Sequence, residues 1–282
     1  MQPLRGLRSR HPAVPPCALP AAAGQNDSVQ AWLEATQRQA AVTRETAHRP
    51  WPLPERGWVM AQTWDDLLFV HWPVDEAQVR RLVPRGLDVD THDGSAWLGV
   101  TPFRVQGVRL RGTLPLPFVS SFLELNVRTY VTRDGKPGIW FFSLDATSRG
   151  AVEVARRTYR LPYHQARATY EQRGLYLHWR SSRIGAERPY VFEASVRGDG
   201  GSAPAAPGSL EHFLAERYCL YAQHRGVIHR ADIHHPPWEL REAELELDLT
   251  TMTPDGIDLP AEAPVAHLAG RQDVVLWPLE PA

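Results

Sequence analysis

Lysine is almost absent from this 282-residue chain. Of the 31 lysine and arginine residues only Lys136 is a lysine, so arginine carries nearly all of the positive charge. A lysine amine is the usual group for forming an imine with a carbonyl substrate, so such chemistry would depend on this one residue. Arginine in place of lysine throughout a chain is commonly a feature of genome composition, although the guanidinium also suits bidentate binding of anions.

Cysteine, long apolar runs and excess charge are also scarce. The two cysteines, Cys17 and Cys219, predict no disulfide framework, which favours a reducing compartment and a cytoplasmic location. No run approaches the roughly 18 apolar residues of a membrane span, and the first residues lack the apolar core of a signal peptide. The net charge of -1 disfavours nucleic acid and anionic membranes as partners. Homo-oligomers remain compatible with this composition.

The N-terminal fifth of the chain is predicted to lie outside the folded domain. Residues 27–48 carry only a thin apolar stripe at helical spacing, and Pro50, Pro52 and Pro54 then read as a stiff linker. We therefore expect residues 1–56 to form a disordered or loosely helical tail, and residues 57–282 to form one domain.

Short alternating segments separated by turn residues predict a mostly antiparallel sheet. The clearest signal is a β-hairpin over 118–145, with its turn at 134–138. A second hairpin is predicted over 87–103 with a turn at 92–94. Asp75 is a candidate N-cap for a helix over 76–83, and Ser209 for a helix in which apolar residues recur from Leu210 to Tyr221.

One face of the first hairpin strand is polar in a regular way. Side chains alternate along a strand, so Glu124, Asn126, Arg128 and Tyr130 share a face. In a closed sheet this face would place a carboxylate, an amide, a guanidinium and a phenol in one pocket. Arg217 falls on the apolar face of the predicted 210–221 helix, so it requires either a carboxylate partner or a ligand.

No established cofactor or metal motif is present. Histidines 224, 229, 234 and 235 do not fit a zinc-binding spacing. The chain has no phosphate-binding glycine loop and no nucleophile-elbow motif. We therefore expect no metal and no cofactor.

Several segments together resemble the YqjF-like family of uncharacterised bacterial proteins: HWPVDEAQVRRLVPRGLDVDTHDGSAWLGVTPF, ELNVRTYV, DGKPGIWFFSLDA, ARRTYRLPY and GSLEHFLAERYCLY. The resemblance spans about residues 58–277. That family in turn resembles the acetoacetate-decarboxylase-like superfamily. This implies an α+β, mostly antiparallel fold, a closed or nearly closed β-barrel around a central cavity with a few peripheral helices.

The more remote resemblance also implies where the chemistry lies. The decarboxylases carry an arginine, then a proline followed by two lysines, the first of which forms a Schiff base. Arg156 and Pro162 match the arginine and the proline, but Tyr163 and His164 stand where the lysines would be. Glu124 matches an acidic residue of the decarboxylase cavity. A Schiff-base decarboxylase is therefore not expected.

Two functions of different class follow. The first is a lysine-independent enzyme that acts on a small carboxylate or carbonyl compound, with His164 as base, Tyr163 as hydrogen-bond donor and Glu124 as a further proton-transfer group. The second is a binding protein that holds a small organic acid or carbonyl ligand without turnover. The predicted ligand-binding residues are Asn126, Arg128, Tyr130, Arg156 and Arg217.

Two structural alternatives remain open for these residues. Glu124 could form an ion pair with Arg128 or Arg156 that only supports the barrel. The cavity could also be filled by Trp97, Trp140 and Phe142, in which case a structural role would be favoured.

Overall fold

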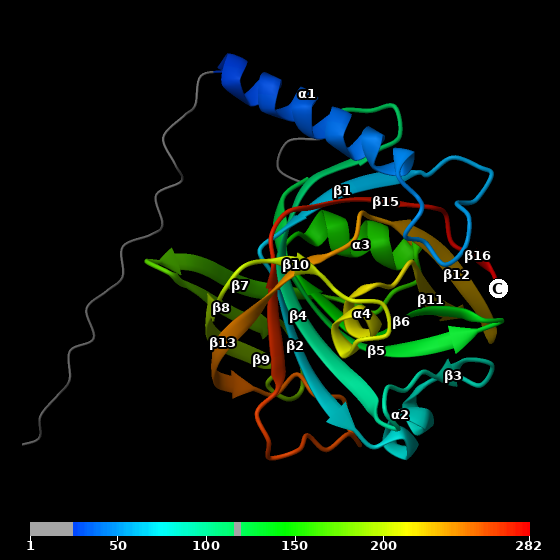
Figure 1. Ribbon diagram of the computed structural model, residues 1–282, viewed down its shortest axis with the longest axis vertical. Helices are drawn as coiled ribbons and strands as arrows, with labels where there is room; N and C mark the ends of the chain where they lie inside the picture. The colour runs from blue at the N-terminus through cyan, green and yellow to red at the C-terminus, as the bar shows by residue number, and fades with distance from the viewer. Residues whose placement is uncertain (1–24, 116–119) are drawn as a thin grey trace, which may run out of the picture.

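A computed structural model describes residues 25–115 and 120–282. These residues form one 16-stranded, mostly antiparallel sheet that curves back on itself (Figure 1). The strands are β1 (Met60–Asp65), β2 (Leu67–Val74), β3 (Asp88–Val89), β4 (Ala96–Leu110), β5 (Phe122–Arg133), β6 (Lys136–Ala146), β7 (Tyr163–Arg173), β8 (Tyr176–Arg183), β9 (Val191–Gly198), β10 (Ala203–Pro204), β11 (Cys219–His224), β12 (Val227–His234), β13 (Glu239–Thr250), β14 (Val265–Ala269), β15 (Gln272–Leu276) and β16 (Glu280–Pro281). The helices are α1 (Gln25–Ala41), α2 (Glu76–Leu82), α3 (Arg149–Thr158) and α4 (Leu210–Ala215), with a 3-10 turn η1 (Val42–Arg44).

The strands close into two rings that share a wall. The first ring runs β1, β15, β12, β11, β6, β5, β4 and back to β1. The second leaves β6 through β7, β8, β9, β13, β14 and β2, and returns to β4. Among the strands that the structure describes, only the β6–β11 and β6–β7 pairs are parallel. The predicted fold class, a mostly antiparallel closed sheet with few helices, is confirmed.

The shared wall contains the hairpin predicted from sequence. β5 and β6 pair in antiparallel register from Glu124 opposite Ala146 to Arg133 opposite Lys136. The turn is tighter than the predicted 134–138, because Asp134 and Gly135 alone adopt positive φ angles, 50° and 70°. Aspartate and glycine tolerate this left-handed conformation, which matches the twist of a two-residue hairpin.

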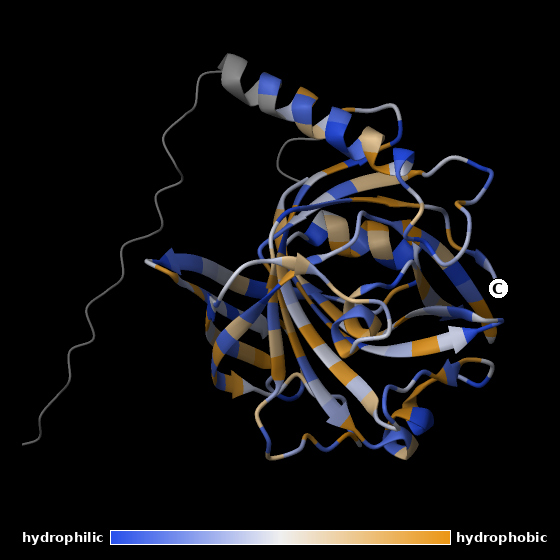
Figure 2. Cartoon of the chain, viewed as in Figure 1, coloured by the Kyte–Doolittle hydropathy of each residue, from blue (hydrophilic) through white to orange (hydrophobic). Residues whose placement is uncertain are grey.

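Both faces of the shared wall are buried, and they differ in chemistry. Leu125 and Val127 on β5 pack into a large apolar core that also contains Trp179 and Phe192 from the second ring. The intervening residues of β5 face the interior of the first ring. Apolar and polar residues accordingly alternate along many of the strands (Figure 2).

Of the two helices predicted with an N-cap, the fold confirms the first and shortens the second. Asp75 caps α2 by accepting a hydrogen bond from the Ala77 backbone amide, as expected. Ser209 caps α4, but this helix ends at Ala215, so the predicted continuation to Tyr221 is wrong. Residues 219–224 instead form β11, because their backbone groups complete the first ring by pairing with β12. Tertiary pairing here overrides a local helical period.

The predicted hairpin over 87–103 is correct in its turn, where Asp93 and Gly94 adopt positive φ angles, and in its returning strand from Ala96, but wrong in the pairing of its two strands. β3 pairs with β5, and the only contact of the hairpin kind is an isolated bridge between His92 and Ser95. β4 pairs with β2 and β5 instead. β4 continues beyond the predicted strand end at residue 103, to Leu110.

The part of the predicted tail that is described packs against the first ring. Gln39 on α1 is buried and donates hydrogen bonds to Thr63 Oγ1 and to the Gly107 carbonyl. Arg49 is buried against Asp232 on β12. The expectation for residues 1–24 lies outside the described residues. None of the described helices has the length and apolar character needed to span a membrane.

Candidate active site

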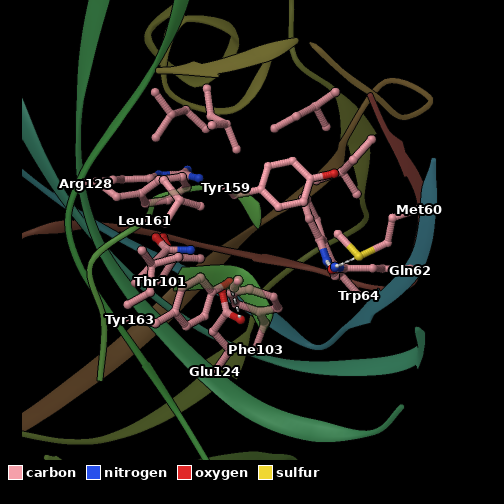
Figure 3. Close-up of a pocket in the computed structure, with 18 of the residues that line it drawn as sticks. Met60, Gln62, Trp64, Thr101, Phe103, Glu124, Arg128, Tyr159, Leu161 and Tyr163 are labelled. Atoms are coloured by element: carbon pink, nitrogen blue, oxygen red, sulfur yellow. Dashed lines mark hydrogen bonds between the residues drawn. The ribbon is translucent and has the colours of Figure 1, made fainter. Parts of the chain in front are cut away.

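A cavity of about 130 Å³ lies inside the first ring. Its walls are largely apolar and include residues of α3. Figure 3 shows Glu124, Arg128 and Tyr159 among the side chains around it. The residues that line it come from β1, β2, β4, β5, β6, β11, β12 and β15, from helices α3 and α4, and from the segments that adjoin them: Met60, Gln62, Trp64, Leu67, Thr101, Phe103, Val108, Phe122, Glu124, Asn126, Arg128, Ile139, Phe141, Leu144, Ala151, Val154, Ala155, Thr158, Tyr159, Leu161, Tyr163, Ala215, Arg217, Leu220, Ile233, His235, Trp238 and Leu276.

The cavity has an exposed end and a closed end. Val154 and Thr158 on α3 are exposed, and Phe122 at the start of β5 is partly exposed. Further along β5, Glu124, Asn126 and Arg128 are all buried, with 5–7% of their surface accessible. The predicted polar face of β5 therefore lines the cavity as a series that begins near the exposed end and finishes with Arg128 at the closed end.

Glu124 is paired with a phenol. The Tyr163 hydroxyl donates a hydrogen bond to Glu124 Oε2 at 3.0 Å, joining the start of β7 to β5. Burial raises the pKa of Glu124 to about 8, with the Tyr163 hydrogen bond opposing the shift and the nearby Asp145 adding to it. The same burial and the proximity of Glu124 raise the pKa of Tyr163 well above its usual value. Glu124 is therefore protonated at pH 7 and able to ionise just above it.

Arg128 carries a charge that the described residues do not balance. Its guanidinium donates to the Leu214 carbonyl at 3.3 Å and lies over the rings of Phe69 and Tyr130. Its Nε has no hydrogen-bond partner among the described residues. At the usual rise per residue of a β-strand, the Cα atoms of Glu124 and Arg128 are about 13 Å apart. The structure contains no ion pair between them. The structural alternative of a Glu124–Arg128 pair is thus not what the fold contains.

The second arginine of the closed end has its own partner. Arg217 Nη1 lies 2.5 Å from Asp90 Oδ2, and Arg217 Nε donates to the Phe213 carbonyl. Burial lowers the pKa of Arg217, while Asp90 opposes that shift. Arg217 lines the cavity, but Asp90 already supplies the carboxylate that pairs with its guanidinium.

Three of the predicted site residues do not line the cavity. Tyr130 is fully buried beyond Arg128, with its hydroxyl 2.7 Å from His71 Nε2. His164 follows Tyr163 on β7, so its side chain points to the other face, where burial and Arg183 lower its pKa to about 4. Arg156 is exposed on α3 and donates to the Tyr163 carbonyl, which fixes the start of β7.

Sequence reasoning missed Thr101. It lies on β4 directly opposite Asn126 and is completely buried. Like Arg128 Nε, Thr101 Oγ1 and Asn126 Oδ1 lack hydrogen-bond partners in the part of the chain that the structure describes. A single threonine between apolar residues of a strand was the available signal. The hairpin prediction could not reveal its position, because the β4–β5 register depends on the whole ring.

Neither a lysine nor a metal cluster occurs at the described cavity. Lys136 lies at the start of β6 with Nζ 5.8 Å from the centre of the Trp51 ring, outside the cavity. Over residues 25–115 and 120–282, no three histidine, cysteine or acidic side chains converge as metal ligands would. His234 and His235 instead form hydrogen bonds with backbone carbonyls.

The fold is that of the acetoacetate-decarboxylase-like proteins. The chain superposes on an acetoacetate decarboxylase from Legionella pneumophila subsp. pneumophila with a TM-score of 0.55 and 11% identity, over 86% of this chain and 95% of the other. It is also similar to MppR, an enduracididine biosynthesis enzyme solved with pyruvate, with a TM-score of 0.56 and 13% identity, over 83% and 93% of the two chains.

Sequence comparison then gives the family. Residues 61–273 match DUF2071, described as an uncharacterized conserved protein, and the chain belongs to this family. It is 44% identical over 228 residues to the uncharacterized protein YqjF of Bacillus subtilis strain 168, covering 80% of this chain and 94% of that protein. The resemblance deduced from sequence is confirmed.

Proposed function

We propose that this protein is a lysine-independent enzyme that binds a small carboxylate or carbonyl compound in the first ring and moves a proton on it. The observation that carries the proposal is the presence, in one cavity, of a buried guanidinium without an ion-pair partner among the described residues and a buried carboxyl group, Arg128 and Glu124. Arg128 would hold an anionic group of the ligand. Glu124, hydrogen bonded to Tyr163, would give or accept the proton.

The pKa of about 8 supports this role for Glu124. An acid or base works best when its pKa lies near the working pH, because both protonation states are then accessible. Tyr163 donates to the ionised carboxylate and so lowers the cost of forming it. His164, outside the cavity, is replaced in this proposal by Glu124 as the proton-transfer group.

Related folds support the choice of ligand class. Two similar structures are those of an acetoacetate decarboxylase and of an enzyme complexed with pyruvate, and acetoacetate and pyruvate are both small keto acids. At 11–13% identity these neighbours support the class of compound and not its identity. An imine mechanism is not proposed, since a phenol occupies the position at Tyr163 and the chain's one lysine lies elsewhere.

A second candidate is a protein that binds the same ligand without turnover. The largely apolar walls favour it, because they offer binding surface but few groups that could act on a substrate. A purely structural role is disfavoured, because Trp97, Trp140 and Phe142 pack into other apolar clusters and do not fill the cavity.

The test compares Glu124→Gln with wild-type protein. A screen of carboxylates and carbonyl compounds by thermal shift identifies ligands, and Arg128→Met serves to show which of them depend on the guanidinium. An enzyme is expected to lose turnover in Glu124→Gln while its ligand affinity stays within a few fold. A ligand that stabilises the wild type but yields no product under any condition would favour the binding protein. If no carboxylate and no carbonyl compound stabilises the protein, both candidates are overturned.

A further inference from the structure

The polar groups around the cavity divide into those already satisfied and those left free. Gln62 accepts from Trp64 Nε1, the Tyr159 hydroxyl donates to the Trp277 carbonyl, and both ring nitrogens of His235 lie within hydrogen-bond distance of backbone carbonyls. Thr158 donates to the Val154 carbonyl. These side chains have little hydrogen-bonding capacity left for a ligand.

The free capacity is concentrated in one place. Thr101 Oγ1, Asn126 Oδ1 and Arg128 Nε are buried and have no hydrogen-bond partner among residues 25–115 and 120–282. Thr101 and Asn126 are directly opposite each other on β4 and β5, and Arg128 is two residues further along β5. A buried polar group without a partner is costly, so a cluster of three marks a position that a polar ligand group or bound water would fill.

One carboxylate is enough to neutralise the positive charge at this cluster. Arg217 is paired with Asp90, which leaves Arg128 as the cation without a counter-charge among the described lining residues. The remaining walls towards α3 are apolar and include Ile139, Leu144 and Leu220. A second charged group on the ligand would meet these walls and the Glu124 carboxyl without a counter-charge.

We propose that the ligand is a short monocarboxylate with an apolar tail, whose carboxylate reaches Arg128 at the closed end and whose tail extends towards α3. This inference rests on the proposed function and narrows its ligand class. The cavity volume of about 130 Å³ sets the size, since an apolar cavity of roughly 150 Å³ admits benzene. Figure 3 shows Arg128 on the far side of Thr101 from Glu124 and Tyr163, so the tail passes the proton-transfer pair.

The experiment measures the affinity of the full chain for pentanoate, glutarate and pentanamide by isothermal titration calorimetry. Glutarate replaces the terminal methyl of pentanoate with a second carboxylate, and pentanamide removes the charge at the same length. We expect pentanoate to bind at least about 100-fold more tightly than glutarate, because the second charge would be buried unpaired. We expect pentanamide and the Arg128→Met variant to show at least about tenfold weaker binding.

The outcomes separate this inference from the proposed function. If glutarate binds as tightly as pentanoate and both lose affinity in Arg128→Met, the apolar-tail inference is overturned and the carboxylate site is retained. Failure of every carboxylate to bind the wild type would overturn both. A crystal structure with 5-bromopentanoate supplies a measurement that needs no variant: the anomalous bromine peak is expected near Val154 and Phe122, and a peak beside Arg128 would overturn the orientation.

Discussion

Tyr163 and Glu124, which are 39 positions apart in the chain, meet through a 3.0 Å hydrogen bond inside the first ring. The bond lies between the first residue of β7 and the third residue of β5, so it exists only when β6, which pairs with both strands, is in place. The proton-transfer pair is therefore a product of ring closure and not of a local motif.

Glu124 should make the stability of the protein depend on pH in a defined direction. The carboxyl group has a pKa near 4.5 when exposed and about 8 in the fold. Between these values the unfolded state binds fewer protons than the folded state, so the free energy of unfolding falls as pH rises. Relative to wild type, Glu124→Gln should gain stability from pH 4.5 to pH 8, by an amount on the order of a few kcal/mol, and the gain should level off above pH 8.

Urea denaturation at pH 5 and at pH 9 measures this gain. Glu262→Gln, which alters an exposed carboxylate, is the control and should show the same difference from wild type at both pH values. An equal difference for Glu124→Gln at the two pH values would show that Glu124 does not carry a raised pKa.

The Arg217–Asp90 ion pair should respond asymmetrically to loss of either partner. The Arg217 side chain is 3% exposed and that of Asp90 is 25% exposed. Asp90→Asn leaves a buried guanidinium beside Arg128 without a counter-charge, with an expected loss of about 3 kcal/mol in the free energy of unfolding. Arg217→Met leaves a carboxylate that water can reach and keeps apolar contact with Phe213, so the expected loss is smaller. Urea denaturation of both variants tests the order, and a greater loss in Arg217→Met would contradict it.

Arg49 should contribute to the stability of the whole domain although it precedes the first strand. Its buried guanidinium lies 3.5 Å from Asp232, donates to the Ile233 carbonyl at 2.6 Å and covers the rings of Trp51 and Tyr218. Arg49→Met is expected to lower the free energy of unfolding by about 3 kcal/mol.

Arg44→Met is the matched control for Arg49→Met, since Arg44 is exposed on the same segment. Its effect is expected to stay within about 0.5 kcal/mol. Similar behaviour of the two variants in urea would mean that residues 42–51 do not pack on β12 in solution.

Gly138 should tolerate no side chain. A Cβ atom at this position would lie 2.6 Å from Cys219 Sγ and 2.9 Å from the Cys219 carbonyl oxygen, where β6 and β11 run in parallel. Gly138→Ala is expected to cost about 2 kcal/mol or more, because the carbonyl cannot move without disturbing the ring. Gly201→Ala is the control, since a Cβ there meets nothing within 4 Å. Thermal denaturation distinguishes them, and equal melting temperatures would contradict the close approach.

The sequence predicts well those features that depend on neighbouring residues. The alternation of Glu124, Asn126 and Arg128 with apolar residues is sufficient to place them on one face, and Asp75 and Ser209 cap the helices that follow them. The family resemblance adds the closed sheet. These signals need no knowledge of which distant strands pair.

What the sequence could not predict depends on pairing across the chain. The helical spacing from Leu210 to Tyr221 is genuine, but the segment gains more from joining β12 and β6 than from another helical turn. Arg217 was correctly expected to need a partner, yet Asp90 lies 127 positions away and only the fold identifies it. The exclusion of His164 from the cavity follows from strand alternation once β7 is known to begin at Tyr163, and that start depends on the pairing of β7 with β6.

The two buried faces of β5 also limit how this segment can change in length. Leu125 and Val127 belong to the core of the second ring, while Glu124, Asn126 and Arg128 line the cavity. Insertion of a single residue before Glu124 without a compensating bulge would exchange these faces, placing three polar side chains in the apolar core and two aliphatic ones in the cavity. Insertions and deletions are therefore expected to be excluded from this strand among folded relatives, and tolerated in the connections at its ends.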